Sequence, residues 1–130
     1  MANSKTQYLE AAFLNKVLKD VDFTVPGVFI GLKVGGVEVA GNGYARQQIT
    51  AANWSNPADD GAGGMESHNT IDIFFPQASG GAWGLVDGFL LADALTGGNR
   101  LYEDALAVSK QIDDLDQFKI NAGDLVVHER

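Results

Sequence analysis

Acidic side chains are the residues whose type and spacing come closest to a chemical site in this sequence. Asp59 and Asp60 are adjacent, and Asp113, Asp114 and Asp116 form a second cluster. Their oxygens could bind Ca²⁺, but neither cluster has the alternating ligands, central glycine and closing glutamate of an EF-hand loop. A hydrolase or isomerase using the second cluster would need a base or nucleophile in a recognisable array. We therefore predict no metal and no cofactor, and expect both clusters to be solvated faces available to partners.

Nucleophilic catalysis finds little support elsewhere in the sequence. The chain has no cysteine and no G-x-S-x-G turn, and its two histidines are His68 and His128. We expect both histidines to be solvated surface residues rather than catalytic bases. The glycine-rich run from Gly41 begins like a dinucleotide-binding turn, but Arg46 stands where the third glycine belongs. These observations predict a protein that is not an enzyme.

The two tryptophans are the remaining candidates for a binding role. Trp83 has apolar flanks, and we expect it in the core. Trp54 lies among polar residues, where packing in the core and a place at an interface remain equally open. Aromatic side chains also line many sugar-binding grooves, so Trp54 is the residue expected to contact a receptor sugar if one is bound.

Length and charge limit the classes of partner. The chain has 130 residues, a formal net charge of −8 and 16 glycines, and its basic residues are scattered singly. An acidic chain without a basic patch is a poor ligand for nucleic acid or for an anionic membrane surface. The length indicates a single domain, residues 1–130. Without a signal peptide or an apolar run of spanning length, we expect synthesis in a cytoplasm.

A helix is predicted at residues 4–20. Its apolar residues recur at helical spacing and form one stripe, namely Leu9, Phe13, Leu14, Val17 and Leu18. Ser4 and Gln7 match a capping box at the start of the helix. We expect the stripe to dock on the sheet of the same chain, with packing against a neighbouring subunit through Phe13 and Val17 as the alternative.

Residues 25–130 are predicted to form a β-rich body. Gly35-Gly36 is expected to connect two strands as a tight hairpin turn. Further strands are predicted at 44–50, 71–75, 83–92, 101–105, 117–120 and 125–127. Residues 89–92 and 101–105 are expected to pair as a hairpin across a turn at 95–99, and the last two strands are expected to form another hairpin. The polar segment 53–69 is expected to be a long exposed loop. The predicted fold is therefore mainly β with one N-terminal α-helix, an antiparallel β-sandwich or open barrel of jelly-roll type.

Several short phrases, in this order, resemble a family of small virion proteins of tailed bacteriophages, which includes tail-fibre proteins and similar capsid cement proteins. The phrases are residues 6–10 (TQYLE), 43–47 (GYARQ), 83–84 (WG), 89–94 (FLLADA), 97–102 (GGNRLY) and 120–125 (INAGDL). The sequence departs from the family pattern around 55–69 and 109–116, which are acidic and are expected to carry partner contacts.

The resemblance implies a virion structural protein without catalytic residues. We expect a capsid decoration or cement protein that stabilises the head, because the chain has no long repetitive shaft sequence. The alternative is a tail-fibre or tail-tip module that contacts a host receptor or its sugars. The expected partners are other copies of the chain, in a symmetric homo-oligomer such as a trimer, and major capsid or tail proteins. The expected location is the virion, after synthesis in the host cytoplasm.

Overall fold

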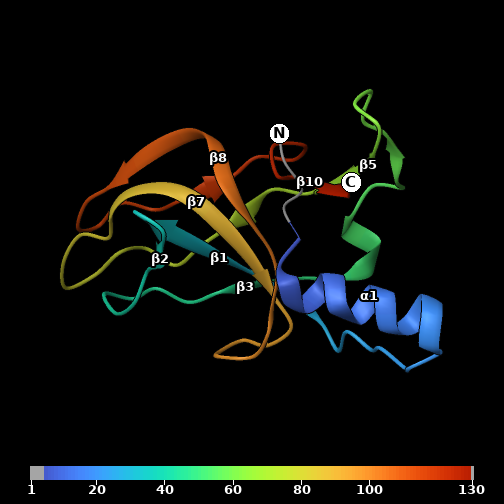
Figure 1. Ribbon diagram of the computed structural model, residues 1–130. Helices are drawn as coiled ribbons and strands as arrows, with labels where there is room; N and C mark the ends of the chain where they lie inside the picture. Colours follow the sequence, from blue (N-terminus) through green and yellow to red (C-terminus); the bar gives the residue numbers. More distant parts are fainter. Residues whose placement is uncertain (1–4, 130) are drawn as a thin grey trace.

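The computed structural model describes residues 5–129 and is mainly β (Figure 1). One α-helix, α1 (Gln7–Lys19), precedes the strands, and a short 3-10 helix, η1 (Ala51–Asn53), lies between β3 and β4. In the described part the strands are β1 (Val28–Val34), β2 (Val37–Glu38), β3 (Gln47–Ile49), β4 (Ala58–Asp59), β5 (Met65–His68), β6 (Ile73–Phe74), β7 (Gly84–Ala92), β8 (Arg100–Ile112), β9 (Lys119–Ile120) and β10 (Val126–Glu129).

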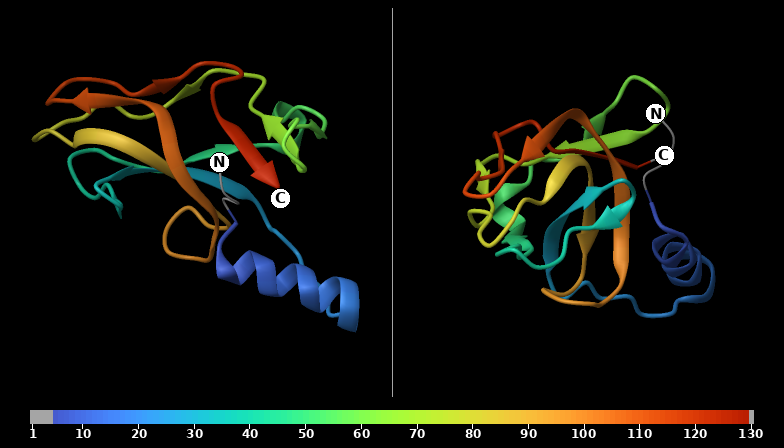
Figure 2. Two further views of the ribbon diagram at one scale, coloured as in Figure 1. Left: turned by 45° about the horizontal axis from the view of Figure 1, so that its top comes forward. Right: turned by 90° about the vertical axis from the view of Figure 1, so that its left-hand side faces the viewer.

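Among residues 5–129, all the strand pairings are antiparallel and fall into three sheets. The largest sheet has the order β2-β1-β7-β8, with β3 also paired to β1. A three-stranded sheet has the order β10-β5-β4, and β6 pairs with β9. Strands β7 and β8 are long and curve over the smaller elements, and the sheets stay open at their edges (Figures 1 and 2). The predicted fold class, mainly antiparallel β with one helix in a sandwich or open barrel, is confirmed.

The turn between β1 and β2 has the conformation that its sequence predicts. Gly35 and Gly36 have φ values of 57° and 86°, so both central residues are left-handed, as a type I′ hairpin requires. Two glycines adopt these angles without the steric penalty of a side chain. The turn places Val37 opposite Val34 and Glu38 opposite Lys33.

The hydrophobic core lies between the large sheet and the β6–β9 pair. Alternate residues of β1 and β7 point into it, including Ile30 and Leu32, which are fully buried. The opposite side of the core is supplied by Ile73 and Phe75 in and after β6, together with Phe118, Ile120 and Leu125 from the chain around and beyond β9. Trp83, whose place in the core was predicted, is 8% exposed and belongs to this cluster.

Two strand predictions were wrong because the pairing is less local than expected. Strand β9 does not form a hairpin with β10; β9 pairs with β6, and β10 pairs with β5. The polar segment 53–69 is not a long loop either, because it contains β4 and β5, which pair with each other. Pairing with β10 and β4 stabilises Met65–His68, although its sequence has little apolar content.

The helix also differs from its prediction. Helix α1 begins at Gln7, and its N-cap is Thr6, whose hydroxyl accepts a hydrogen bond from the Leu9 N–H. Ser4, the predicted cap, lies outside the described residues. The helix projects from one end of the sheets and packs against β8 (Figure 2). Of its predicted stripe, only Leu9 is fully buried.

Candidate functional site

A cluster of polar side chains lies where residues 39–46 leave the sheet between β2 and β3. Both of these strands pair with the same edge of β1, so this excursion interrupts the ladder between them. At the interruption the Leu32 N–H donates to the Tyr44 hydroxyl, 3.0 Å away. The Tyr44 hydroxyl donates in turn to Glu38 Oε2 at 2.7 Å. A side-chain hydroxyl thus replaces the missing strand partner of a buried backbone donor.

Arg46 ties this excursion to the loop between β7 and β8. Its Nε and one terminal nitrogen each donate at 2.8 Å to the two oxygens of Glu38, which makes the pair bidentate. The other terminal nitrogen donates to the carbonyl oxygens of Ala94 and Gly97, also at 2.8 Å. Because the Arg46 side chain is only 6% exposed, all four hydrogen bonds are largely shielded from water.

Gly31 makes room for this network on the surface of β1. A Cβ atom at this position would stand 2.8 Å from both Glu38 Oε2 and the Tyr44 hydroxyl, and 3.0 Å from Leu90 Cδ1. These distances are shorter than ordinary contacts, so any larger residue at position 31 would displace the carboxylate or the phenol. The glycine is therefore part of the network, although it contributes no polar atom.

The ionisation of the network suits a structural ion pair. Burial acts to raise the pKa of Glu38, but the hydrogen bonds from Arg46 and Tyr44 outweigh it, and the pKa of this carboxyl lies below its usual value. Burial, reinforced by the Glu38 carboxylate, raises the pKa of Tyr44. A general acid or base works best with a pKa near the working pH. These two groups are held away from that range, with the carboxyl ionised and the phenol protonated.

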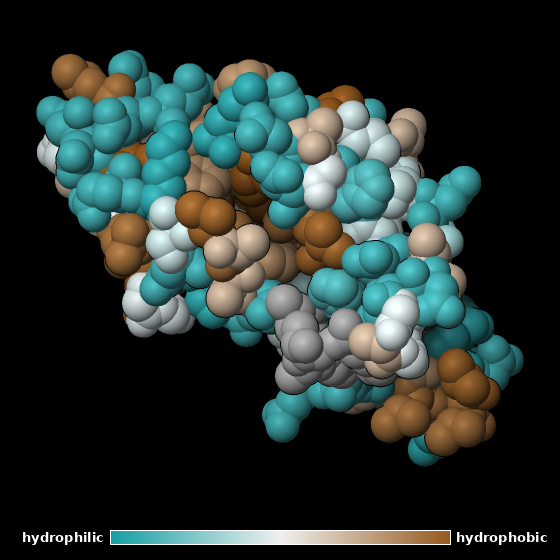
Figure 3. Space-filling view, turned by 90° about the horizontal axis from the view of Figure 1, so that it is seen from above, coloured by the Kyte–Doolittle hydropathy of each residue, from teal (hydrophilic) through white to brown (hydrophobic). Residues whose placement is uncertain are grey.

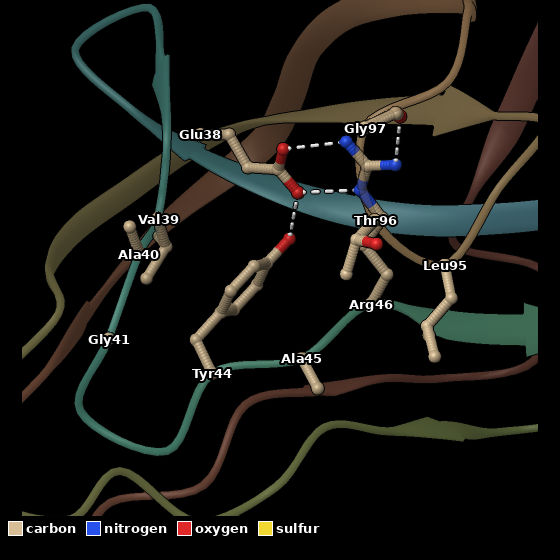
Figure 4. Close-up of a pocket in the computed structure, with 10 residues that line it drawn as sticks. All are labelled: Glu38, Val39, Ala40, Gly41, Tyr44, Ala45, Arg46, Leu95, Thr96 and Gly97. Carbon is tan, nitrogen blue, oxygen red and sulfur yellow. Dashed lines mark hydrogen bonds and ion pairs between the residues drawn. The ribbon is translucent and has the colours of Figure 1, made fainter.

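A shallow cleft of about 330 Å³ lies beside the network (Figure 4). Its walls come from the 39–46 excursion and from the β7–β8 loop, with apolar side chains such as Ala40 and Leu95. Glu38 and Arg46 face each other across its floor, as the dashed lines in Figure 4 show. Since the carboxylate oxygens and the guanidinium already bind each other, the cleft offers a ligand mainly apolar contacts.

The two acidic clusters turn out to be parts of turns. Asp59 is exposed and accepts a hydrogen bond from the Gly61 N–H. The Asp60 side chain is only 1% exposed, and its Oδ1 accepts from the N–H groups of Ala62 and Gly64 at 2.7 and 3.0 Å. The expectation of a solvated pair is therefore wrong for Asp60, whose carboxylate closes the turn between β4 and β5.

His128 was also expected to be a solvated surface residue, and the structure corrects this. Its side chain is 15% exposed, and its Nδ1 lies 3.5 Å from Asp60 Oδ2 and 4.0 Å from Glu66 Oε2. Strand β10 brings the histidine to these carboxylates by pairing with β5. His68, by contrast, is exposed as expected.

The second acidic cluster forms the turn after β8. The Asp113 N–H donates to Asp116 Oδ2 at 2.9 Å, and Leu115 between them has a positive φ of 73°. The Asp116 carbonyl oxygen accepts from the Ala78 N–H, which fastens the turn to the chain after β6. Asp113, Asp114 and Asp116 are all exposed. Within residues 5–129, no group of three or more acidic, histidine or cysteine side chains is placed to hold a metal ion.

The remaining predicted interface residues divide between contacts within the chain and open surface. Trp54 is half-buried and packs against the core, so its ring is not an open platform for a sugar. Phe13 is half-buried and meets the Phe23 ring edge-on, with centroids 6.2 Å apart. Val17 is 79% exposed. The structure therefore does not bring the predicted interface residues together into one site.

A scan against protein-family models identifies one family over nearly the whole chain. Residues 4–128 match the model described as podophage GP4 fiber I protein gp80. The chain belongs to this family. It is therefore related to fibre proteins of a tailed phage, and the predicted resemblance to small virion proteins is confirmed. No curated protein matches the chain.

Three of the six phrases that carry the resemblance of this gp80-family chain meet in the polar network. Phrase 43–47 supplies Tyr44 and Arg46, and the carbonyl oxygens that Arg46 binds lie at the end of phrase 89–94 and the start of phrase 97–102. These two phrases also contact each other directly, because Asp93 Oδ1 of the first accepts from the Asn99 N–H of the second at 2.8 Å. Their shared role is to fix loops to the large sheet.

The sequence contained a signal for this network, although Glu38 was not among the predicted site residues. Arg46 was noted only because it replaces a glycine in a nucleotide-binding pattern. An arginine in an apolar, glycine-rich setting needs a carboxylate partner when it is buried. Glu38 is the carboxylate before the excursion, and its pairing with Arg46 could have been predicted from that need.

Proposed function

We propose that this protein is a non-enzymatic structural component of the fibre apparatus of a short-tailed phage, assembled into the virion after synthesis in the host cytoplasm. The observation that carries the proposal is the family match over residues 4–128, whose description names a podophage fibre protein. Family membership itself indicates a phage structural protein located in the virion. The fibre is the finer assignment that we propose.

The geometry supports a structural role. The polar cluster of Glu38, Tyr44 and Arg46 has its hydrogen-bonding groups committed to one another and to the backbone. The pKa of Glu38 is lowered and that of Tyr44 is raised, so neither group is ready to transfer a proton near neutral pH. We infer that these residues hold the fold and that function resides in surface contacts with capsid or tail proteins.

Capsid decoration is the second candidate, and one observation favours it. The described chain is a short β body with a single helix, without the long repetitive shaft that would make an elongated fibre alone. A module of this shape could cover a lattice of capsid proteins.

A search of the described residues for a helix with the length and apolar character of a membrane span found none.

Labelled virions separate the two candidates. The Gly35-Gly36 turn is suited to an epitope insertion, because a Cβ atom at either glycine would meet no atom within 4 Å. Gold-labelled antibody at the tail end of virions that carry the tagged protein supports the fibre assignment. Label distributed over the head would refute the fibre assignment and support capsid decoration. Purified virions that lack the protein, as judged by mass spectrometry, would refute both.

A further inference from the structure

The outward face of α1 carries apolar side chains that the body does not cover. Leu14, Val17 and Leu18 are 61%, 79% and 74% exposed, and Val21, just beyond the helix, is 48% exposed. We call these four residues the outer stripe. Figure 3 shows apolar surface gathered at the end of the molecule that carries the second half of the helix. Contiguous apolar patches on the surface of a monomer often mark contact sites.

The opposite face of the helix explains why the outer stripe remains open. Leu9 is 2% exposed where the first turn meets β8, and Phe13 packs against Phe23. The helix therefore has two apolar faces, of which the body covers one. An isolated helix of only 13 residues is marginal in water, so the second half of α1 gains most from a partner that covers it.

The spacing of the outward residues is that of a helix–helix seam. Ala11, Leu14 and Leu18 are separated by three and four residues, the alternation that keeps side chains on one side of paired helices. Val21 follows the left-handed C-cap Asp20 and extends the apolar surface beyond the end of the helix. Val17 widens this seam on one flank. Such a pattern is complementary to another copy of itself.

Charge also favours a second copy. Residues 1–22, the N-terminal segment that includes α1, contain three lysines and three acidic residues, so this segment is neutral. The remaining six basic and fourteen acidic residues, in 23–130, account for the whole net charge of −8. Because residues 23–130 are acidic, the bodies of two copies repel each other. The copies can approach with the least repulsion through the neutral N-terminal segment.

We propose that copies of this protein associate by packing their outer stripes against each other. A symmetric contact covers the patch on every copy, so a pair removes both stripes from water, and the polar rim enlarges the contact. With four apolar side chains from each copy at its centre, this contact is small beside specific interfaces, whose lower limit is around 1,000 Å². The association is therefore weak and depends on concentration. It does not depend on whether the protein is located at the head or the tail.

Sedimentation velocity of the purified full chain over a range of about 1–300 µM tests the association. The wild type is expected to shift from monomer to a small oligomer within this range. The double variant Leu14→Gln/Leu18→Gln is expected to weaken self-association at least tenfold, while glutamine preserves helix propensity. The matched control is Val108→Gln, because Val108 is 80% exposed on β8, away from the stripe. A helical circular dichroism signal and an unchanged melting temperature confirm that each variant is folded.

Oxidative crosslinking then locates the contact, because the chain has no cysteine of its own. Val17→Cys is expected to form a disulfide-linked dimer much faster than Val108→Cys under the same conditions. A wild type that remains monomeric at the highest concentration would overturn the proposal. Equal self-association of the wild type and the double variant would also overturn it, as would equal crosslinking rates at the two positions.

Discussion

Removing a single oxygen atom tests whether the Tyr44 hydroxyl bridges the gap in the β1 ladder. In the variant Tyr44→Phe the ring can keep its place, edge-on to Trp83 with centroids 5.5 Å apart. The Leu32 N–H loses its acceptor, and Glu38 Oε2 loses a donor. A buried donor without a partner costs about 1–3 kcal/mol, and a hydrogen bond to a charged group contributes about 1.5–3 kcal/mol.

The two contributions do not add in full. The Glu38 side chain is 18% exposed and keeps both hydrogen bonds from Arg46, so water can replace part of the lost interaction. Leu32 is fully buried, so its N–H has no such replacement. We therefore expect the free energy of unfolding to fall by about 3 kcal/mol. For a chain of this length, such a loss lowers the melting temperature by roughly 10 °C.

Urea unfolding followed by tryptophan fluorescence measures this loss, with Trp83 as a core reporter. The m-value should stay unchanged, since the same surface is exposed on unfolding. Tyr8→Phe is the matched control, because Tyr8 is 41% exposed, and it should cost less than about 0.5 kcal/mol. A loss below about 1 kcal/mol for Tyr44→Phe, or an equal loss for both variants, would refute the bridging role of the hydroxyl.

Three further predictions concern the same network and the β4–β5 turn. Gly31→Ala should lower the free energy of unfolding by about 1–3 kcal/mol through overpacking against Glu38 and Tyr44. In urea unfolding, the same substitution should lower this free energy less in the Tyr44→Phe variant than in the wild type. Because the pKa of Glu38 is lowered below its ordinary value of 4.5, its contribution to stability is present above pH 4.5 and is lost as the pH falls through the folded-state pKa. Melting temperatures measured between pH 7 and pH 3 should therefore fall less steeply for Glu38→Gln than for the wild type, and equal slopes would contradict this assignment. In urea unfolding, Asp60→Ala should lower the free energy of unfolding by about 2–3 kcal/mol, because the buried carboxylate accepts from two N–H groups. Asp59 is exposed and accepts from one N–H, so Asp59→Ala should cost less than about 1 kcal/mol. Comparable losses for the two variants would contradict the buried role of Asp60.

The parts of the fold that could be predicted are those that local chemistry determines. The Gly35-Gly36 turn was predicted because two adjacent glycines between β-branched strands favour one turn type. The pairing of β7 with β8 was predicted for the same reason, from the turn at 95–99. In both cases the strands that pair are neighbours in the sequence, so a short segment contains the information needed.

The wrong predictions concern contacts between distant segments. Asn69 is fully buried, its side-chain amide donates to the Asn121 carbonyl oxygen, and its side-chain oxygen accepts from the Leu125 N–H. This one residue directs the chain after β9 away from a local hairpin and toward β5. A polar residue in a predicted loop gives no sign in the sequence that it will be buried. The pairing of β9 with β6 and of β10 with β5 could therefore not be predicted from the hairpin pattern.

The helix shows a different limit, because its apolar residues were correctly identified but assigned to one face. Periodicity predicts which residues share a side of a helix, and an apolar side is usually assigned to the core of the same chain. In α1 the apolar residues extend around two sides, and Leu9 is buried while Leu14 and Leu18 are exposed. A candidate contact surface is therefore most visible where the sequence predicts burial and the structure shows exposure.

The contrast between predicted burial and observed exposure also separates the residues that specify the fold from those available to partners. The family phrases at 43–47, 89–94 and 97–102 supply a network whose hydrogen-bonding groups bind one another within the chain. The outer stripe of α1 follows phrase 6–10 and lies outside these three phrases. Substitutions in the network should therefore lower stability and affect assembly only through folding. Substitutions in the stripe should change assembly while the melting temperature of the monomer stays the same.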